Sequence, residues 1–588
     1  MEIPHLDPNV DEEVNLMRKK QTAMFVILLV VLLSGCAGVR IHAVDQHPKG
    51  MLLPDQATVN SQILSEYLKV EGGFYKDNTK PPCTCVAFSG GGIRSAAFSI
   101  GVMKGLHAIN GEGGEPFLHQ IDIMSAASGG AYGMSWYYMN QLGPDAISKD
   151  DLFLSPAQNY LLENADFMTV RRFVQGSVSD MLLIPWNLFA NGFFGWHLNS
   201  SFIATQTYEN AIRQTFHGNK PGDFSRMPAL LKNNHLPFFI ITTTAHIDED
   251  QLHYDSLLSK RVFEFTPLRF GSDAFGYSDV GQDFPLTVAE AVEVSGAAID
   301  SFESFTGARQ KVAGSLLNID TGRFIDNYKE KRSFLKNVGY WLSPAPFYLY
   351  QRAYILDAYG KRMRLSDGGH ADNLAGFPLI RRLCSNIIIV DAEYDPHYSF
   401  GAYFKLKESI EREMHVTFRL TNGHHNVEAI PKKIEAGKTL ESVSVATPPD
   451  IRGTFDPAHP VIPGKIGPFP IGAPFNEPDL FLNVTYIKMA IDDRFAKWAH
   501  LQVEERTALE TQYGSEVTSY AVASLQDTCE KRPYILSALW KCSFPQYSTA
   551  HQNFSSEQFA AYVQLGERIV KNELTYDPGR KTLKISGH

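Results

Sequence analysis

The chain has 588 residues, of which 44 % are hydrophobic and 20 % are charged, and its formal net charge is −10. This composition is typical of a globular protein with enough apolar side chains for a large core. No basic run is interleaved with aromatic side chains, so the sequence argues against nucleic acid as a partner.

Residues 1–36 have the pattern of an export signal and are predicted to be one. Residues 18–20 are basic and residues 23–33 are apolar, a run shorter than the roughly 20 residues that a membrane span needs. The following Ser-Gly-Cys ends in Cys36 and resembles a bacterial lipobox. The resemblance implies lipidation of Cys36 and a lipid-anchored protein of the bacterial cell envelope, at the outer membrane because residue 37 is alanine. An ordinary signal peptide or an anchor helix is the alternative.

A polar linker over residues 37–80 is expected next, with a helix near residues 57–70. A catalytic core is then predicted over 81–400. It opens with a buried strand over 84–89, a glycine turn and a helix, which is how an α/β layer begins.

Further strands are expected along this core. The pattern of strand, tight turn and helix recurs at residues 121–133. Residues 237–245 and 386–391 are rich in β-branched side chains, which is typical of strands buried on both faces. The apolar stretches 181–198 and 340–356 contain aromatics, Pro, Gly and Asn, and suit a lid, an interfacial patch or core packing under loops.

Residues 401–588 are predicted to extend the same domain. A stretch rich in Pro and Gly at 447–478 is expected to be a loop, and residues 480–588 to be helical apart from a strand at 480–489.

Six cysteines constrain the covalent structure. Without Cys36 an odd number remains, so at least one thiol is unpaired within the chain. The sequence singles out Cys529 and Cys542, which could close a small loop in an oxidising compartment. Cys83 and Cys85 have the wrong spacing for a zinc knuckle, and the sequence indicates no metal site.

Residues 121–133, IDIMSAASGGAYG, have the layout of a nucleophile elbow. In such a tight turn the residues two before and two after the serine must be small, as Ala126 and Gly130 are. Ser128 would then lie at a helix N-terminus, which favours developing negative charge. The motif usually has glycine where Ala126 stands, and a plain turn of small residues is the alternative.

A glycine loop over residues 89–94, SGGGIR, could supply the oxyanion site through its backbone N–H groups. Arg94 could brace this loop or hold a phosphate. A P-loop is disfavoured because no Lys-Ser/Thr follows, and the dinucleotide pattern fails at Ser95. A plain glycine turn remains possible.

The base is sought in residues 364–376, RLSDGGHADNLAG, where Asp367 precedes two glycines. A base must lie within hydrogen-bond reach of the nucleophile. The alternatives are a turn without catalytic role, the carboxylates Asp372 and Asp391, and a histidine base. Ser295, on an expected helix, is interpreted as a packing residue. The histidines considered are His370, His397, His415, His424 and His425.

The three motifs in this order resemble the patatin-like and cytosolic phospholipase A2-like acyl hydrolases. The resemblance continues at residues 285–300 and 544–566 and covers about 84–570. It implies a three-layer α/β/α core with a mixed central sheet and an elaborated C-terminal region.

The resemblance also implies the chemistry. Ser128 would attack an ester carbonyl, with Asp367 as its base in a Ser–Asp dyad. Gly91 and Gly92 would form the oxyanion hole, and Arg94 would support that loop or a phosphate headgroup. The expected substrate is a phospholipid or lysophospholipid at a membrane surface, with no cofactor and no metal. A transacylase or general esterase with the same dyad, or a catalytically silent scaffold, are the alternatives.

Overall fold

The computed structural model describes residues 56–77, 79–154, 202–246, 257–281, 284, 286–297, 322–326, 362–422, 425–426, 455–475, 477–526, 544–549 and 554–586. The predictions for the signal segment with Cys36, for Cys529 and Cys542, and for the two apolar stretches lie outside these residues. Within them, no helix is both long and apolar enough to cross a bilayer.

Five parallel strands form the centre of a mixed sheet. Their order is β13-β9-β1-β2-β3. They are β1 (Thr84–Phe88), β2 (Ile123–Ala127), β3 (Phe238–Ala245), β9 (Asn386–Asp391) and β13 (Glu477–Lys488).

Antiparallel strands extend both edges of this centre, so the predicted mixed sheet is confirmed. Beyond β13 lie β12 (Val461–Ile471), β10 (Thr417–Asn422) and β11 (His425–Asn426). Beyond β3 lie β4 (Val262–Phe265), β5 (Arg269–Ser272) and β6 (Gly276–Asp279), while β8 (Arg362–Asp367) pairs with both β3 and β7 (Arg323–Asp326).

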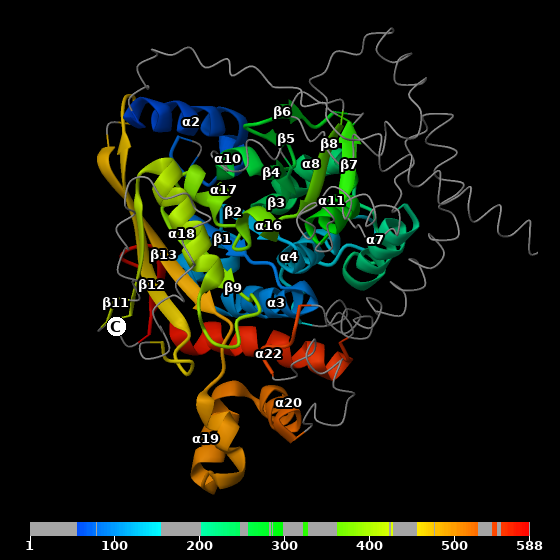
Figure 1. Ribbon diagram of the computed structural model, residues 1–588, viewed down its shortest axis with the longest axis vertical. Coiled ribbons are helices and arrows are strands. Elements are labelled where there is room, and N and C mark those ends of the chain that lie inside the picture. The colour runs from blue at the N-terminus through cyan, green and yellow to red at the C-terminus, as the bar shows by residue number, and fades with distance from the viewer. Residues whose placement is uncertain are drawn as a thin grey trace, which may run out of the picture.

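Helices cover both faces of the sheet, as the three-layer prediction requires (Figure 1). Helix α3 (Gly92–Ala108) joins β1 to β2, and α4 (Gly129–Met139) follows β2 on the way to β3. Right-handed crossovers that advance in one direction place their helices on one face. Helix α17 (Phe377–Arg381), which lies between β8 and β9 in the chain, covers the other face together with α18 (Gly401–Met414).

The remaining elements of the described chain surround this core. They include α2 (Gln56–Glu71), the 3₁₀ turn η3 (Phe117–Gln120), α7 (Phe202–Phe216), α8 (Met227–Asn234), α10 (Leu258–Arg261), α11 (Val288–Ser295), α16 (Gly369–Asp372), α19 (Val503–Tyr513), α20 (Ser515–Gln526), α22 (Ser556–Glu573), β14 (Leu574–Asp577) and β15 (Thr582–Ile585).

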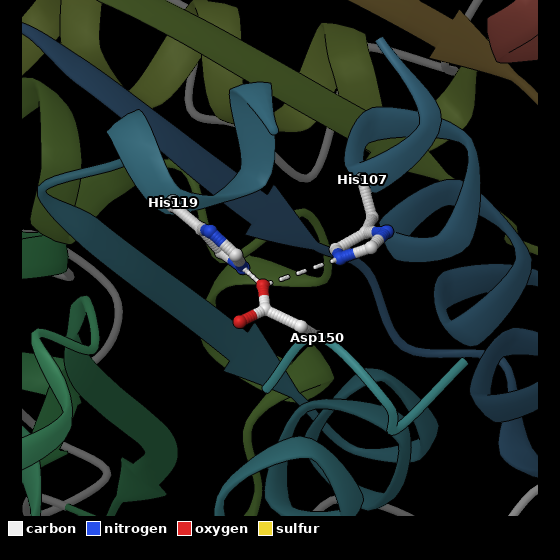
Figure 2. A group of neighbouring side chains, drawn as sticks. All are labelled: His107, His119 and Asp150. Carbon is white, nitrogen blue, oxygen red and sulfur yellow. Dashed lines mark ion pairs between the residues drawn. The ribbon is translucent and has the colours of Figure 1, made fainter. Parts of the chain in front are cut away.

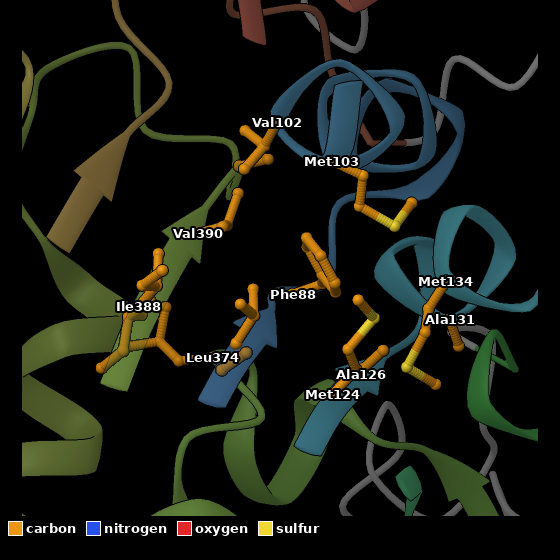
Figure 3. Packing of buried hydrophobic residues seen from close by; sticks show 14 of the residues in the cluster. Phe88, Val102, Met103, Met124, Ala126, Ala131, Met134, Leu374, Ile388 and Val390 are labelled. Carbon is orange, nitrogen blue, oxygen red and sulfur yellow. The ribbon is translucent and has the colours of Figure 1, made fainter. Parts of the chain in front are cut away.

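The core lies between the helices and the central strands. Val102 and Met103 of α3 face Val390 of β9 and Phe88 of β1 (Figure 3). Behind α3, helix α22 packs closely because a Cβ atom at Gly101 would lie 2.0 Å from the carbonyl oxygen of Val563. The C-terminal region is thereby joined to the helix that begins at the glycine loop.

Helix α2, expected within a linker, is held against this core by buried charges. Arg382 contacts Glu71 at 2.7 Å and Glu264 at 2.8 Å, and all three side chains are buried. Ion pairs at this depth fix the position of α2, since breaking one leaves an uncompensated buried charge.

The prediction of a loop over 447–478 is wrong for its second half, where β12 forms. Strand β12 contains Pro463, Pro468 and Pro470, which cannot donate to a strand ladder. Its register with β13 shifts between Ile466 and Phe469, around Pro468, and again between Phe469 and Ile471, around Pro470. Pro468 and Pro470 are tolerated because each falls at one of these irregularities.

A disulfide joins Cys85 of β1 to Cys384, which lies just before the neighbouring strand β9. The two cysteines are 299 positions apart, and the sequence pattern had not linked them. Cys83 is a free, exposed thiol. The bond ties two central strands of the sheet at the ends from which they start.

Candidate active site

Ser128 lies between the end of β2 and the start of α4, with φ 50° and ψ −125°. Few side chains adopt a positive φ, and such a conformation persists only where the surroundings enforce it. Here a Cβ atom at Gly129 would lie 2.0 Å from the carbonyl oxygen of Gly92, and one at Gly130 would lie 2.5 Å from that of Phe88. The turn is therefore pressed against the glycine loop, which explains the run of small residues around Ser128.

Asp367 reaches Ser128 from the end of β8. The Ser128 hydroxyl donates to Asp367 Oδ2 at 2.8 Å, and the two residues are 6 % and 5 % exposed. The backbone N–H of Gly369 donates to Asp367 Oδ1 at 2.7 Å. One carboxylate oxygen is thus held by the backbone while the other faces the hydroxyl.

The glycine loop lies beside Ser128. A Cβ atom at Gly90 would lie 3.2 Å from Ser128 Cβ, and the N–H of Gly90 donates to the carbonyl oxygen of Asn373 at 2.8 Å. Gly91, with φ 147°, precedes α3, and Gly92, with φ 63°, is its first residue. The first N–H groups of a helix have no intrahelical acceptor. Two helix N-termini, those of α3 and α4, therefore meet at Ser128, and both favour negative charge there.

Arg94 is buried and bonded to carbonyl oxygens. Its Nε and Nη2 donate to the carbonyl oxygen of Ala392 at 3.2 and 3.0 Å, Nη1 donates to that of Tyr547, and Nη2 also reaches Thr549 Oγ1 at 3.4 Å. With 1 % of the residue exposed, Arg94 joins the start of α3 to two distant segments. Of the two roles that the sequence offered, this geometry favours support of the loop.

Ser295 has a larger part than the packing role inferred from the sequence. Its hydroxyl donates to the carbonyl oxygen of Thr242 at 2.7 Å and accepts the N–H of Ser128 at 2.8 Å. Ser295 thus holds the backbone of the elbow against β3. Ser295 lies in the segment 285–300 that carries the family resemblance, and this position could have pointed to a role at the site. No spacing rule connects Ser295 to Ser128, however.

The described alternatives to Asp367 are engaged elsewhere. His370 Nδ1 lies 3.1 Å from Ser366 Oγ, which also contacts His246 Nε2 at 2.7 Å. Asp372 accepts the N–H groups of Leu374 and Phe377, and so acts as a cap. Asp391 is paired with Lys488 at 2.7 Å. Of the carboxylates and imidazoles weighed from the sequence within the described chain, Asp367 is the group bonded to Ser128.

Glu293, two residues before Ser295, is a second buried carboxyl group near this site. It is fully buried, and within the described part of the chain neither of its oxygens has a hydrogen-bond partner. Burial raises the pKa of Glu293 to about 8. Because the pKa of Glu293 is higher in the folded state than in the unfolded state, its contribution to stability is fully present below the unfolded pKa. This contribution is lost as pH rises through the folded pKa, where the buried carboxyl group must ionise.

We therefore expect Glu293→Gln to be more stable than the wild type at pH 8.5, by roughly 4–5 kcal/mol, and similar to it at pH 4.5. Urea unfolding at both pH values measures this difference. Glu510→Gln, at an exposed position of α19, is the control and should follow the wild type. Equal pH dependence in Glu293→Gln and the wild type would contradict the assignment.

Comparison with known proteins finds a family model that matches part of the chain. Residues 86–299 match the family model described as patatin-like phospholipase. This segment includes Ser128 and the glycine loop and ends before Asp367. No curated protein matches the chain.

Among solved structures, the chain is similar to human GIVD cytosolic phospholipase A2, with 12 % identity, a TM-score of 0.45, and coverage of 88 % of this chain and 64 % of that chain. The same human protein in complex with methyl gamma-linolenyl fluorophosphonate matches with 13 % identity, a TM-score of 0.44, and coverage of 88 % and 61 %. The chain thus spans less than two thirds of the length of these structures.

Proposed function

We propose that the patatin-like phospholipase domain over residues 86–299, completed by Asp367, hydrolyses the acyl esters of phospholipids or lysophospholipids. The observation that carries the proposal is the 2.8 Å hydrogen bond from Ser128 to Asp367, formed at a turn with positive φ between two helix N-termini. The description of the matched family supports the choice of a lipid ester.

In the first half of the reaction, Ser128 Oγ attacks the ester carbonyl and its proton passes to Asp367 Oδ2. The carbonyl oxygen becomes an oxyanion, which the N–H groups of Gly91 and Gly92 would stabilise from the start of α3. The tetrahedral intermediate then collapses. The alcohol portion of the lipid leaves with the proton from Asp367, and the acyl group remains on Ser128.

In the second half, Asp367 takes a proton from water, which attacks the acyl-enzyme. Collapse of this second intermediate releases the fatty acid and returns the proton to Ser128 Oγ. One water is consumed for each ester cleaved, and no cofactor takes part in these steps. Ser295 would keep the elbow in place throughout, because it accepts the N–H of Ser128.

We also propose that lipid on Cys36 anchors the enzyme to a bacterial envelope membrane, where its substrate lies. The support is the order of basic run, apolar run and Ser-Gly-Cys at the N-terminus.

One mass-spectrometric experiment on the full chain tests both proposals. An alkyl fluorophosphonate is expected to label Ser128, and the label should disappear in Ser128→Ala. Ser99→Ala is the matched control, because Ser99 is a buried serine whose hydroxyl has no hydrogen-bond partner in the described chain, and it should keep the label. The same digest should contain Cys36 as the N-terminal residue with the added mass of lipid.

Incubation with a mixed phospholipid extract is expected to release fatty acid and the matching lysophospholipid. Transfer of the acyl group to added alcohol, in preference to water, would identify a transacylase instead. A folded wild type that is neither labelled nor active would favour the alternative of a catalytically silent scaffold. Labelling that persists in Ser128→Ala would refute the assignment of Ser128 as the nucleophile.

A further inference from the structure

Two histidines and an aspartate converge at the opposite end of α3 from the glycine loop (Figure 2). His107 lies in the last turn of α3, His119 lies in η3, and Asp150 lies in a turn after α4. One nitrogen of each ring and one oxygen of Asp150 lie within 4.8 Å of one another. From Gly92 to His107 the helix rises roughly 22 Å at 1.5 Å per residue, so this cluster is separate from the dyad.

Polar atoms in this cluster lack partners. His107 Nε2 and both ring nitrogens of His119 are buried without a hydrogen-bond partner in the described chain. Both Nε2 atoms face the same oxygen, Asp150 Oδ1, at 3.9 Å from His107 and 3.6 Å from His119. These separations exceed those of hydrogen bonds. An unmade buried hydrogen bond is costly, and a group bound between these nitrogens and the shared carboxylate would offset that cost.

We propose that His107 Nε2, His119 Nε2 and Asp150 Oδ1 bind a divalent transition-metal ion of the zinc type. Two imidazoles and a carboxylate are a common ligand set for zinc, and a water molecule completes the tetrahedron. With metal–ligand bonds of about 2.0–2.1 Å, the ligand atoms must lie roughly 3.3 Å apart. The distances of 3.6 and 3.9 Å from the two histidines to Asp150 lie within a few tenths of an ångström of this value, and the two imidazole nitrogens, which lie within 4.8 Å of each other, would close on the ion.

The surroundings support this site. A histidine that binds metal usually donates its second N–H to a carboxylate. Glu115 Oε2 lies 3.8 Å from His119 Nδ1, where it can take that role. The side chain of Asp150 is 62 % exposed, which leaves it free to adjust and gives the ion a way in from solvent. The sequence led us to expect no metal site, because its spacings match no metal motif.

Bound metal would join elements that carry the proposed active site. Helix α3 starts at the glycine loop and ends at His107, while η3 leads directly into β2, which ends at the elbow. A metal ion linking His107 to His119 would therefore fix the start of β2 against the end of α3. The ion would stabilise this pair and take no part in ester cleavage.

The test uses the full chain, treated with a chelator and then dialysed. Calorimetric titration with Zn²⁺ alone is expected to show one site of micromolar or tighter affinity, and excess Zn²⁺ should raise Tm by several degrees. Co²⁺ should give the intense visible absorption of a tetrahedral ion. Asp150→Asn, an exposed substitution that should not affect folding, should weaken Zn²⁺ binding at least tenfold. His107→Gln with His119→Gln should abolish binding.

Two controls make the outcome specific. His235→Asn removes an exposed histidine elsewhere and should bind Zn²⁺ like the wild type. Lys149→Gln removes a neighbouring positive charge and should tighten binding. A wild type that binds Zn²⁺ no more tightly than the double variant, or an Asp150→Asn protein that binds as tightly as the wild type, would overturn the proposal.

Discussion

Asp367→Asn is expected to lower kcat/KM for lipid ester hydrolysis by about 10⁴-fold or more, close to the loss in Ser128→Ala, because groups that act as one unit are not additive. An amide cannot take the serine proton. It also presents either an N–H or an oxygen to a hydroxyl that now has no base, although the 2.8 Å contact and the turn would persist. Steady-state kinetics on the two variants and on the double variant measure this, with circular dichroism to show that each is folded.

The control for this prediction is His370→Ala. His370 contacts Ser366 at 3.1 Å, so its removal should leave kcat/KM within about tenfold of the wild type. Fluorophosphonate labelling separates the remaining possibilities, because Asp367→Asn should react slowly at Ser128 while Ser128→Ala should not react at all. If His370→Ala lost as much activity as Asp367→Asn, the base would be a histidine and the dyad would be refuted.

The elements around the site could be predicted from sequence because their requirements are local. Strand β9 has the expected bounds of 386–391, and β3 begins one residue later than expected and ends at Ala245. The small residues around Ser128 predicted a tight turn, because such a turn leaves little room for side chains. The structure shows this at Gly130, where a Cβ atom would lie 2.5 Å from the carbonyl oxygen of Phe88.

Contacts between distant segments could not be predicted from the sequence in this way. The disulfide joins cysteines 299 positions apart, and Arg94 reaches the carbonyl oxygens of Ala392 and Tyr547. Ser295 holds Ser128 from 167 positions away. Each of these partners becomes a neighbour only when the sheet assembles, and no single-sequence periodicity encodes that. The cluster of His107, His119 and Asp150 escaped notice for the same reason.

Strand β12 shows a different kind of failure. Its proline and glycine content is normally evidence for a loop. Pairing with β10 on one side and β13 on the other overrides that local preference, and the two register shifts accommodate Pro468 and Pro470. Tertiary context decided the structure there, whereas local preference was sufficient at β9.

Lys488→Met is expected to destabilise the fold by about 3–5 kcal/mol at pH 8, because it strands buried carboxylates. Lys488 is fully buried and contacts Asp391 at 2.7 Å, Asp395 at 2.9 Å and Glu393 at 3.1 Å. Burial alone would lower the pKa of Lys488, but these three carboxylates, Asp391 foremost, raise it well above the ordinary value. Against the opposing effect of burial, Lys488 holds the pKa of Asp395 at about 2.

The pH dependence distinguishes this account from a loss of packing. In the wild type, the lowered pKa of Asp395 stabilises the fold above the unfolded value and is lost as pH falls through about 2. Without Lys488, burial should raise the pKa of the carboxyl groups, so the variant regains stability as pH falls from 8 toward 5. Urea unfolding should therefore show a deficit that shrinks with falling pH, while Lys497→Met, at an exposed position, stays near the wild type.

A deficit independent of pH would mean that Lys488 matters for its volume rather than its charge.

The substitution of Lys488 is also expected to affect the proposed active site. Asp391 and Glu393 flank Ala392, the carbonyl of which accepts two donors of Arg94, and Arg94 in turn supports the loop with Gly91 and Gly92. Lys488→Met should therefore lower kcat and leave KM nearly unchanged under conditions where the protein remains folded. The reason is that a displaced glycine loop weakens binding of the oxyanion more than binding of the lipid.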